Sequence, residues 1–186
     1  MLLPLVSVIV NVCNGERYVG QCLDSVLALQ GHYPLQVIVV DDASTDATAD
    51  VLGRYADPRI TVVAIQRNVG AAAAINHAFG LVRGELVGRI DYDDRYHPFW
   101  LVRSVAALEA HPDAAFVCAN AIMIDAQGTP GALTGPFQYG EAPGSFDRFR
   151  SMLTRHFVTA PTILARTRHW RRAMPVPAGM TSATGT

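Results

Sequence analysis

Three aspartates lie within four positions of the stretch RIDYDDRYHP, residues 89–98: Asp91, Asp93 and Asp94. Carboxylates this close raise one another's pKa, so the cluster calls for a positive partner. A D-x-D spacing directly after an apolar strand offers hard oxygen ligands to Mg²⁺ or Mn²⁺, which proteins usually hold together with substrate phosphates. The stretch therefore predicts a divalent metal and a diphosphate. The alternative is an acidic turn that only caps the next helix.

A second acidic pair, Asp41 and Asp42, ends the apolar run in VVDDAST. An Asp at the end of a parallel strand can accept hydrogen bonds from the ribose or base of a nucleotide. In the alternative reading the pair closes a turn, and Ser44 or Thr45 is the N-cap of the following helix. These residues alone leave both readings open.

The sequence lacks the signature motifs of several other reaction classes. The sequence has no G-x-S-x-G, no H-E-x-x-H and no glycine-rich phosphate loop, and its six histidines show no ligand spacing. Cys13, Cys22 and Cys118 are an odd number without a CxxC pair. They predict free core thiols in a reducing cytoplasm, with no zinc site and no disulfide framework.

The elements that must position the acidic residues repeat one strand–loop–helix pattern four times. Apolar runs at 5–11, 35–40, 60–65 and 85–90 are each followed by a polar break and then by helical periodicity. Strands that are uniformly apolar predict an α/β fold with a mainly parallel sheet covered by helices on both faces. Ligands bind beyond the carboxyl ends of such strands. The polar segments 11–14, 41–44, 66–68 and 91–94 should therefore meet at one rim.

Composition limits the remaining alternatives. The 186 residues suit one domain, half of them are apolar, and no run approaches the ~20 apolar residues of a membrane-spanning helix. Residues 128–147 are rich in Gly and Pro and predict a loop. Residues 1–144 hold eight Arg and fifteen acids, whereas residues 145–186 hold seven Arg and one acid. That basic segment predicts either an anion-binding surface or a solvated helix face.

Four motifs in order resemble the family 2 glycosyltransferases, which have the GT-A fold. VSVIVNVCNGERYVGQCLDSVLAL is similar to the V-S-V-I-I-P-x-Y-N opening of that family, and IVVDDASTDAT to its V-V-D-D-G-S-T-D-x-T. NVGAAAAINHAFGLVRGELVGRIDYDD is similar to its N-x-G-x-A-x-A-x-N-x-G/A stretch leading to D-A-D-D, and HP follows. The resemblance covers nearly all of residues 5–174.

The resemblance implies a Rossmann-like sandwich and an inverting transfer of sugar from a nucleoside diphosphate, typically UDP. Asp41 would contact uracil, Asp91 would lie near the ribose and diphosphate, and Asp93 would ligate Mn²⁺ or Mg²⁺ with support from Asp94. A separate carboxylate would deprotonate the acceptor hydroxyl. The further residues expected around the nucleotide are Asn11, Asp42 and Asn68.

The sequence departs from the family at the acceptor side and in the first loop. Asn11 and Cys13 stand where the family usually has Pro and Tyr, and Ala160 stands where many members have His. No Asp or Glu follows Asp147, so the catalytic base is unassigned and the C-terminal part is expected to be incomplete. The alternative function is a nucleotide-binding or partner-binding module without catalysis.

These readings set the remaining expectations. Residues 1–127 should form the nucleotide-sugar-binding part, and residues 128–186 an acceptor-side loop and a truncated basic segment of the same domain. The expected partners are a UDP-sugar and a saccharide or lipid-linked acceptor, but no nucleic acid. We expect a cytoplasmic protein that contacts the inner membrane face through the Arg cluster 166–172 and self-associates through uncovered apolar surface.

Overall fold

The structure is a computed structural model that describes residues 2–133 and 160–176. Its elements in chain order are β1 (Val6–Val12), α1 (Val19–Leu27), β2 (Leu35–Asp42), α2 (Thr48–Leu52), β3 (Ile60–Ile65), α3 (Ala71–Phe79), β4 (Leu86–Asp91), α4 (Trp100–Ala110), β5 (Phe116–Val117), β6 (Ile122–Ile124), β7 (Pro130–Leu133), η1 (Ala160–Thr162), β8 (Leu164–Arg166) and α6 (Thr167–Ala173).

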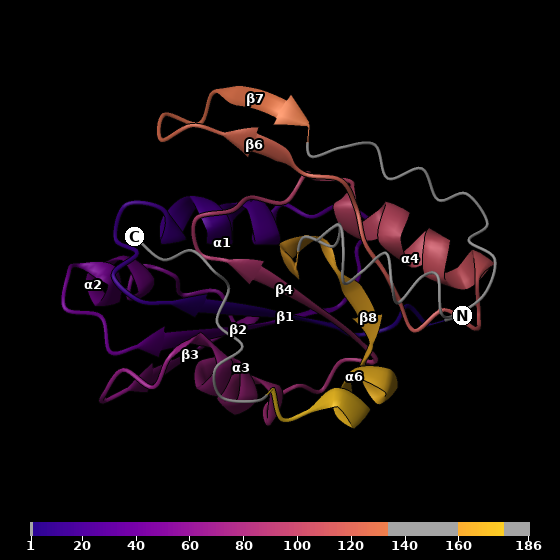
Figure 1. Cartoon of the computed structure of the whole chain (residues 1–186), viewed down its shortest axis with the longest axis horizontal. Coiled ribbons are helices and arrows are strands. Elements are labelled where there is room, and N and C mark those ends of the chain that lie inside the picture. The colour runs from indigo at the N-terminus through magenta and orange to yellow at the C-terminus, as the bar shows by residue number, and fades with distance from the viewer. Residues whose placement is uncertain (1, 134–159, 177–186) are drawn as a thin grey trace, which may run out of the picture.

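The main sheet has six strands in the order β3-β2-β1-β4-β8-β5. The first four are parallel, and β8 runs antiparallel between β4 and β5. This confirms the predicted α/β class and the mainly parallel sheet. Strands β6 and β7 form a separate antiparallel pair that stands apart from the main sheet (Figure 1).

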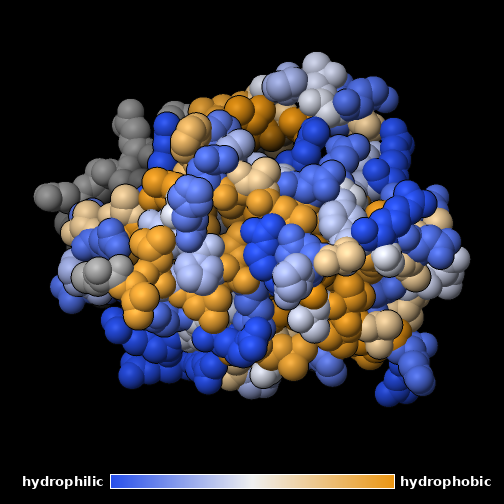
Figure 2. Space-filling view, turned by 180° about the vertical axis from the view of Figure 1, so that it is seen from behind, coloured by the Kyte–Doolittle hydropathy of each residue, from blue (hydrophilic) through white to orange (hydrophobic). Residues whose placement is uncertain are grey.

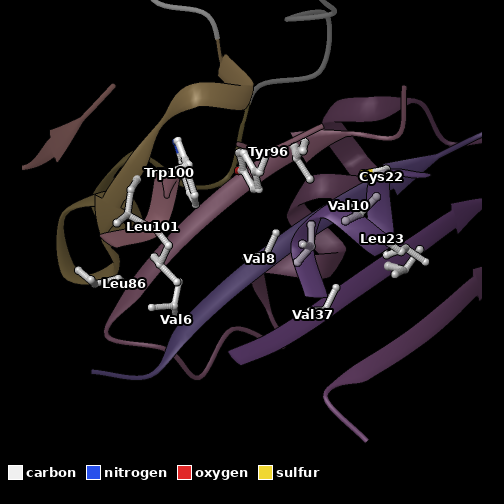
Figure 3. Packing of buried hydrophobic residues seen from close by; sticks show 14 of the residues in the cluster. Val6, Val8, Val10, Cys22, Leu23, Val37, Leu86, Tyr96, Trp100 and Leu101 are labelled. Carbon is white, nitrogen blue, oxygen red and sulfur yellow. The ribbon is translucent and has the colours of Figure 1, made fainter. Parts of the chain in front are cut away.

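Alternate residues of the central strands enter two separate cores, because successive side chains of a strand point to opposite faces. One core packs Val8, Val10 and Val37 against α1 and α4, and includes Tyr96 and Trp100 (Figure 3). The other packs Ile9, Ile38 and neighbouring side chains against α3 and α6. Helices therefore cover both faces of the sheet, as predicted (Figure 1).

Two local predictions were wrong. Helix α2 begins at Thr48 after an Ala47 N-cap rather than at Ser44 or Thr45, because those two residues bond instead to Asn14 of the loop after β1. The predicted loop 128–147 contains strand β7 at its start, and from residue 134 it lies outside the described residues. Of the predicted core thiols, Cys22 is buried, whereas Cys13 and Cys118 are only half-buried.

Hydrophobic surface is left uncovered at the sheet edge and on the small hairpin. Edge strand β3 has only half-buried and exposed positions, and the hairpin exposes Ile122, Met123 and Leu133. Figure 2 shows hydrophobic residues gathered across the middle of one face of the molecule. Self-association through such surface stays a prediction. None of the helices in the described ranges has the length and hydrophobicity needed to cross a bilayer.

Candidate functional site

The carboxyl ends of the four parallel strands bring the predicted segments to one edge of the sheet. The strand register places Asn11 of β1 beside Val40 of β2 on one side and Asp91 of β4 on the other. One residue further, Val12 is the partner of Asp41. Asn11 and Asp91 are therefore direct neighbours, and Asp41 lies one residue further along at the same edge of the sheet, as expected from strand ends that point the same way.

The loop after β1 is bonded to the loop after β2. Asn14 Oδ1 accepts hydrogen bonds from Thr45 N at 2.8 Å and Thr45 Oγ1 at 3.2 Å, while Asn14 N donates to Ser44 Oγ at 2.9 Å. Asn14 and Ala43 both adopt positive φ, at 54° and 59°. Positive φ is costly for Ala and better tolerated by Asn.

The same two loops are also joined by hydrogen bonds from backbone amides of one loop to acidic side chains of the other. Glu16 Oε2 accepts from Ala47 N at 2.8 Å, and Asp46 Oδ2 accepts from Glu16 N at 3.1 Å. Gly15 N donates to Thr48 Oγ1 at 2.8 Å. A Cβ on Gly15 would lie 2.4 Å from Val12 Cγ2 and 2.7 Å from Tyr92 Cδ2, so only glycine fits at this approach. The rim is thus prebuilt by contacts within the chain.

Asp41 and Asp42 are both buried, and each bonds to backbone. Asp41 Oδ1 accepts from Ser44 N at 3.0 Å, which is the turn-closing role. Asp42 Oδ1 accepts from Val69 N and its Oδ2 from Gly70 N, each at 2.8 Å. Asp42 therefore holds the entry to α3 with both carboxylate oxygens, whereas Asp41 Oδ2 accepts no hydrogen bond within the described residues.

Asn68 joins the same end of the site from the loop after β3. Its Nδ2 donates to Asp42 O at 3.3 Å and lies 3.2 Å from Cys13 Sγ, and its Oδ1 accepts from Gly70 N at 3.1 Å. These bonds fix Asn68 beside the strand ends of β1 and β2.

Arg89 supplies a positive partner for the aspartate cluster from within the chain. Its Nη2 donates to Asp91 Oδ1, and this ion pair is mostly shielded from solvent. Burial, and then the neighbouring charges of Asp91 and Asp93, raise the pKa of Asp94 to about 6, while Arg89 lowers it. The cluster is therefore only partly neutralised by the protein, and negative charge remains at Asp93 and Asp94.

A rigid support lies behind these aspartates. The Tyr96 ring stacks on Trp100 with centroids 3.8 Å apart, and its hydroxyl donates to Arg89 O at 3.0 Å. Tyr96 N donates to Ser25 Oγ of α1 at 3.0 Å, and Cys22 Sγ lies 3.5 Å from Asp91 O. The backbone that carries the aspartates is thereby fixed to α1 and α4.

In the part of the chain that the structure describes, two polar atoms at this rim are buried without a hydrogen-bond partner: Asn11 Oδ1 and Arg89 Nε. Leaving such an atom unpaired costs roughly 1–3 kcal/mol. One is an acceptor and the other a donor, on neighbouring strands. Their presence beside Asp91 is typical of a site whose polar groups are completed by a bound molecule.

The residues suit a divalent cation only in part. Asp93 and Asp94 offer hard carboxylate oxygens, but Asp91 is already paired with Arg89. Within residues 2–133 and 160–176, no group of three or more His, Cys, Asp or Glu side chains is arranged to hold a metal. The donor set thus fits the mode of Mg²⁺ and Mn²⁺ in which one or two carboxylates act together with substrate phosphates.

Sequence reasoning did not predict that Arg89 pairs with Asp91, or that Glu16 accepts a hydrogen bond from Ala47 N at the start of α2. The signal for Arg89 was available, because residues two apart on a strand share a face and Arg89 precedes Asp91 by two. The signal for Glu16 was not, since its partner Ala47 is 31 residues away.

The family model described as "Glycosyl transferase family 2" matches residues 7–169, which includes every loop of the rim. This chain belongs to glycosyltransferase family 2. Among its family relatives is the putative glycosyltransferase EpsE of Bacillus subtilis, 34% identical over 132 residues that are 69% of this chain and 47% of EpsE. The putative teichuronic acid biosynthesis glycosyltransferase TuaG of Bacillus subtilis is 43% identical over 95 residues, 50% of this chain and 37% of TuaG.

Solved structures agree with the family 2 fold. S. aureus TarS 1-349 in complex with UDP-GlcNAc matches 90% of this chain and 47% of TarS, with a TM-score of 0.70 and 24% identity, which supports the fold alone. Mannosyltransferase PcManGT from Pyrobaculum calidifontis, in complex with GDP-Man and Mn²⁺, matches 65% of this chain and 37% of that protein, with a TM-score of 0.57 and 31% identity. The chain spans about half or less of the length of these relatives.

Proposed function

We propose that this family 2 glycosyltransferase chain binds a nucleoside-diphosphate sugar, UDP-linked, at the rim formed by Asn11, Asp41 and Asp91. The observation that carries the proposal is the parallel register, which pairs Asn11 with Asp91 and brings Asp41 to the same edge of the sheet. The sugar would pass to an acceptor hydroxyl with inversion. GDP-Man and Mn²⁺, the ligands in the PcManGT structure, support a nucleotide-sugar donor.

Each residue has a proposed role that its geometry supports. Asp41, with Oδ2 left unbonded within the described residues, would accept a hydrogen bond from the base. Asp42 and Asn68 would act through the loop they hold. Asp91, kept in place by Arg89, would accept from the ribose, and Asn11 would complete that side.

Asp93 would be the metal ligand, and Asp94 would support it. A bound Mn²⁺ or Mg²⁺ would neutralise charge on the departing diphosphate. The protein's own part is to fix the backbone next to these carboxylates, because the Tyr96 hydroxyl donates to Arg89 O and the Tyr96 ring stacks on Trp100, so that less reorganisation is needed when the ligand arrives.

The acceptor is proposed to be a saccharide or a lipid-linked saccharide, used at the cytoplasmic face of a membrane. EpsE, TuaG and the succinoglycan biosynthesis protein ExoO of Rhizobium meliloti are named for glycosyltransfer or polysaccharide synthesis, which supports this acceptor class. Arg168, Arg171 and Arg172 of α6 are exposed and would face the anionic surface.

A nucleotide-binding module without transfer is the second candidate. It would use the same rim of strand ends for binding alone. The two functions share the donor site and differ only in turnover.

Calorimetric titration of UDP tests the shared site. With Mn²⁺ present, UDP should bind, and EDTA should weaken binding at least tenfold. Asp93→Asn should behave as wild type does in EDTA, whereas Asp113→Asn, an acid in the turn after α4, should bind as wild type does. Equal UDP binding with and without metal would contradict the role of Asp93. Release of sugar from UDP-sugars by the same chain would then separate transferase from binding module.

A further inference from the structure

Strand β3 leaves one edge of the main sheet open. It is the last strand on its side, after β1 and β2, and within the described residues no other strand pairs with its outer side (Figure 1). Proteins usually guard such an edge with a charge, a proline or a bulge, because its free N–H and C=O groups can pair with another chain. β3 has the sequence ITVVAI, pairs with β2 without a register shift and carries none of these three devices.

The polar backbone groups of β3 alternate between β2 and the outside. In a parallel pair, each strand bonds to its neighbour through every second residue and turns the residues between them to the other side. Val37 N of β2 donates to Arg59 O at 2.8 Å, which fixes this alternation. Val63 therefore directs its N–H and C=O groups to β2, whereas Val62 and Ala64 direct theirs outward.

The side chains of β3 suit pairing with a second copy of the same strand. All of them are aliphatic or threonine, and Val62 is 43% exposed. β-branched side chains pack well against one another across strands. Because none of them is charged, two copies of β3 can approach without repulsion between like charges.

An antiparallel arrangement about a two-fold axis at Val62 matches the outward groups of both copies. Val62 then lies opposite Val62 of the second copy, and each N–H donates to the carbonyl oxygen of the other. Ala64 N donates in the same way to Ile60 O of the second copy, because both residues are two positions from the axis. The axis passes through a residue, so opposite side chains lie on the same face of the joined sheet.

The charges that flank β3 favour this antiparallel direction. Asp57 stands five positions before Val62, and the exposed Arg67 stands five positions after it. Each Asp57 therefore comes level with Arg67 of the second copy. In a parallel pair of the same strands, Asp57 would face Asp57 and Arg67 would face Arg67, which is unfavourable.

We infer that β3 is a homodimer interface, at which two copies of this chain join their sheets in antiparallel direction about Val62. The dimer is closed, because each copy has one β3 and the opposite edge of the sheet, β5, is only two residues long. The contact is one strand wide, so dimerisation should depend on concentration within the range of transient complexes. The inference does not depend on nucleotide-sugar binding.

Sedimentation velocity from low micromolar to near-millimolar concentration tests the interface. Wild type should shift from monomer to dimer and no further. Val62→Lys places two ammonium groups opposite each other and should weaken dimerisation at least tenfold. Ala64→Pro removes an outward N–H that β2 does not use, and should weaken dimerisation as strongly. The control is Leu81→Lys, because Leu81 is 41% exposed and lies outside β3.

Disulfide cross-linking tests the register by a gain of signal. Val62→Cys should form a cross-linked dimer on oxidation, because directly opposite residues of this kind have Cα atoms about 5.5 Å apart, within the reach of a disulfide. Thr61→Cys should not, since the two copies of residue 61 are displaced from each other along the strands. Wild type under the same oxidation measures any cross-linking through the native cysteines.

Three results would overturn the interface. They are a wild type that stays monomeric at every concentration, an equal loss of dimer in Leu81→Lys, and equal cross-linking of Thr61→Cys and Val62→Cys. Urea denaturation of Val62→Lys and Ala64→Pro shows whether each variant keeps its fold. The cross-linking result decides the interface if either of them does not.

Discussion

Arg89 and Asp91 stand two residues apart on β4, on the same face of the sheet, and the Arg89 guanidinium donates a hydrogen bond to the Asp91 carboxylate. The pair places a fixed cation inside an acidic cluster that was expected to rely on a metal. Asp91 is thereby oriented before any ligand binds, and less negative charge is left for a divalent ion.

Replacement of Arg89 should strengthen metal binding. Arg89→Gln removes one positive charge close to three carboxylates, so we expect Mn²⁺ affinity in the absence of nucleotide to rise about fivefold at low salt, equivalent to ~1 kcal/mol. Arg103→Gln on α4 is the control. Weaker Mn²⁺ binding by Arg89→Gln would mean that Arg89 acts mainly by holding Asp91 in place.

The stability of the fold should depend on pH through Asp94. Its pKa is raised to about 6 by burial and by Asp91 and Asp93, from an ordinary value of roughly 4 in the unfolded chain. The folded state therefore binds this proton more tightly, and the free energy of unfolding should fall as pH rises from about 4 to 6. Because Asp94 is partly exposed, we expect a loss of about 1 kcal/mol.

Urea denaturation at several pH values, on wild type and Asp94→Asn, measures this loss. The variant carries no charge at this position, so the component of the pH dependence that comes from Asp94 should disappear. An identical pH dependence in both proteins would show that Asp94 does not titrate in this range. Added Mn²⁺ and UDP should restore stability at pH 7 in wild type, since a cation favours the charged carboxylate.

Replacement of Ala43 by glycine should stabilise the fold. It has φ +59° and stands where the family motif carries Gly, so Ala43→Gly removes a left-handed strain worth roughly 1 kcal/mol. Ala106→Gly, at an exposed interior position of α4, should instead lose about 0.5–1 kcal/mol. Chemical denaturation compares the two. Destabilisation by both variants would show that Ala43 is not strained.

The stability of the fold should depend on the side chain of Asn14 as well as on its positive φ. Asn14→Gly keeps the positive φ but loses both bonds from Thr45, so we expect a loss of about 1 kcal/mol and weaker UDP binding. Asn14→Asp keeps the acceptor and should retain most of the stability. If the Gly variant is as stable as wild type, the bonds between the two loops contribute nothing measurable.

Most of the fold could be predicted from the sequence because four apolar runs of similar length, each followed by a helical pattern, are typical of a parallel sheet covered by helices. The meeting of Asn11, Asp41 and Asp91 followed from the same rule. The start of α2 could not be predicted, since Ser44 and Thr45 are used by Asn14, thirty residues earlier. Strand β7 was also missed, because Pro130 and Gly131 resemble a loop and the strand is exposed along its length.

The position of β1 in the middle of the sheet also governs the order in which the chain can fold. Its residue Val6 pairs with Leu35 on one side but with Leu86 on the other, so one edge of β1 stays open until some eighty further residues have been synthesised. Parallel pairing over such a separation is slow, and an open apolar edge recruits other chains. Nascent chains that end before β4 should therefore be the aggregation-prone species, and Asn11 and Asp91 become neighbours only when β4 pairs with β1.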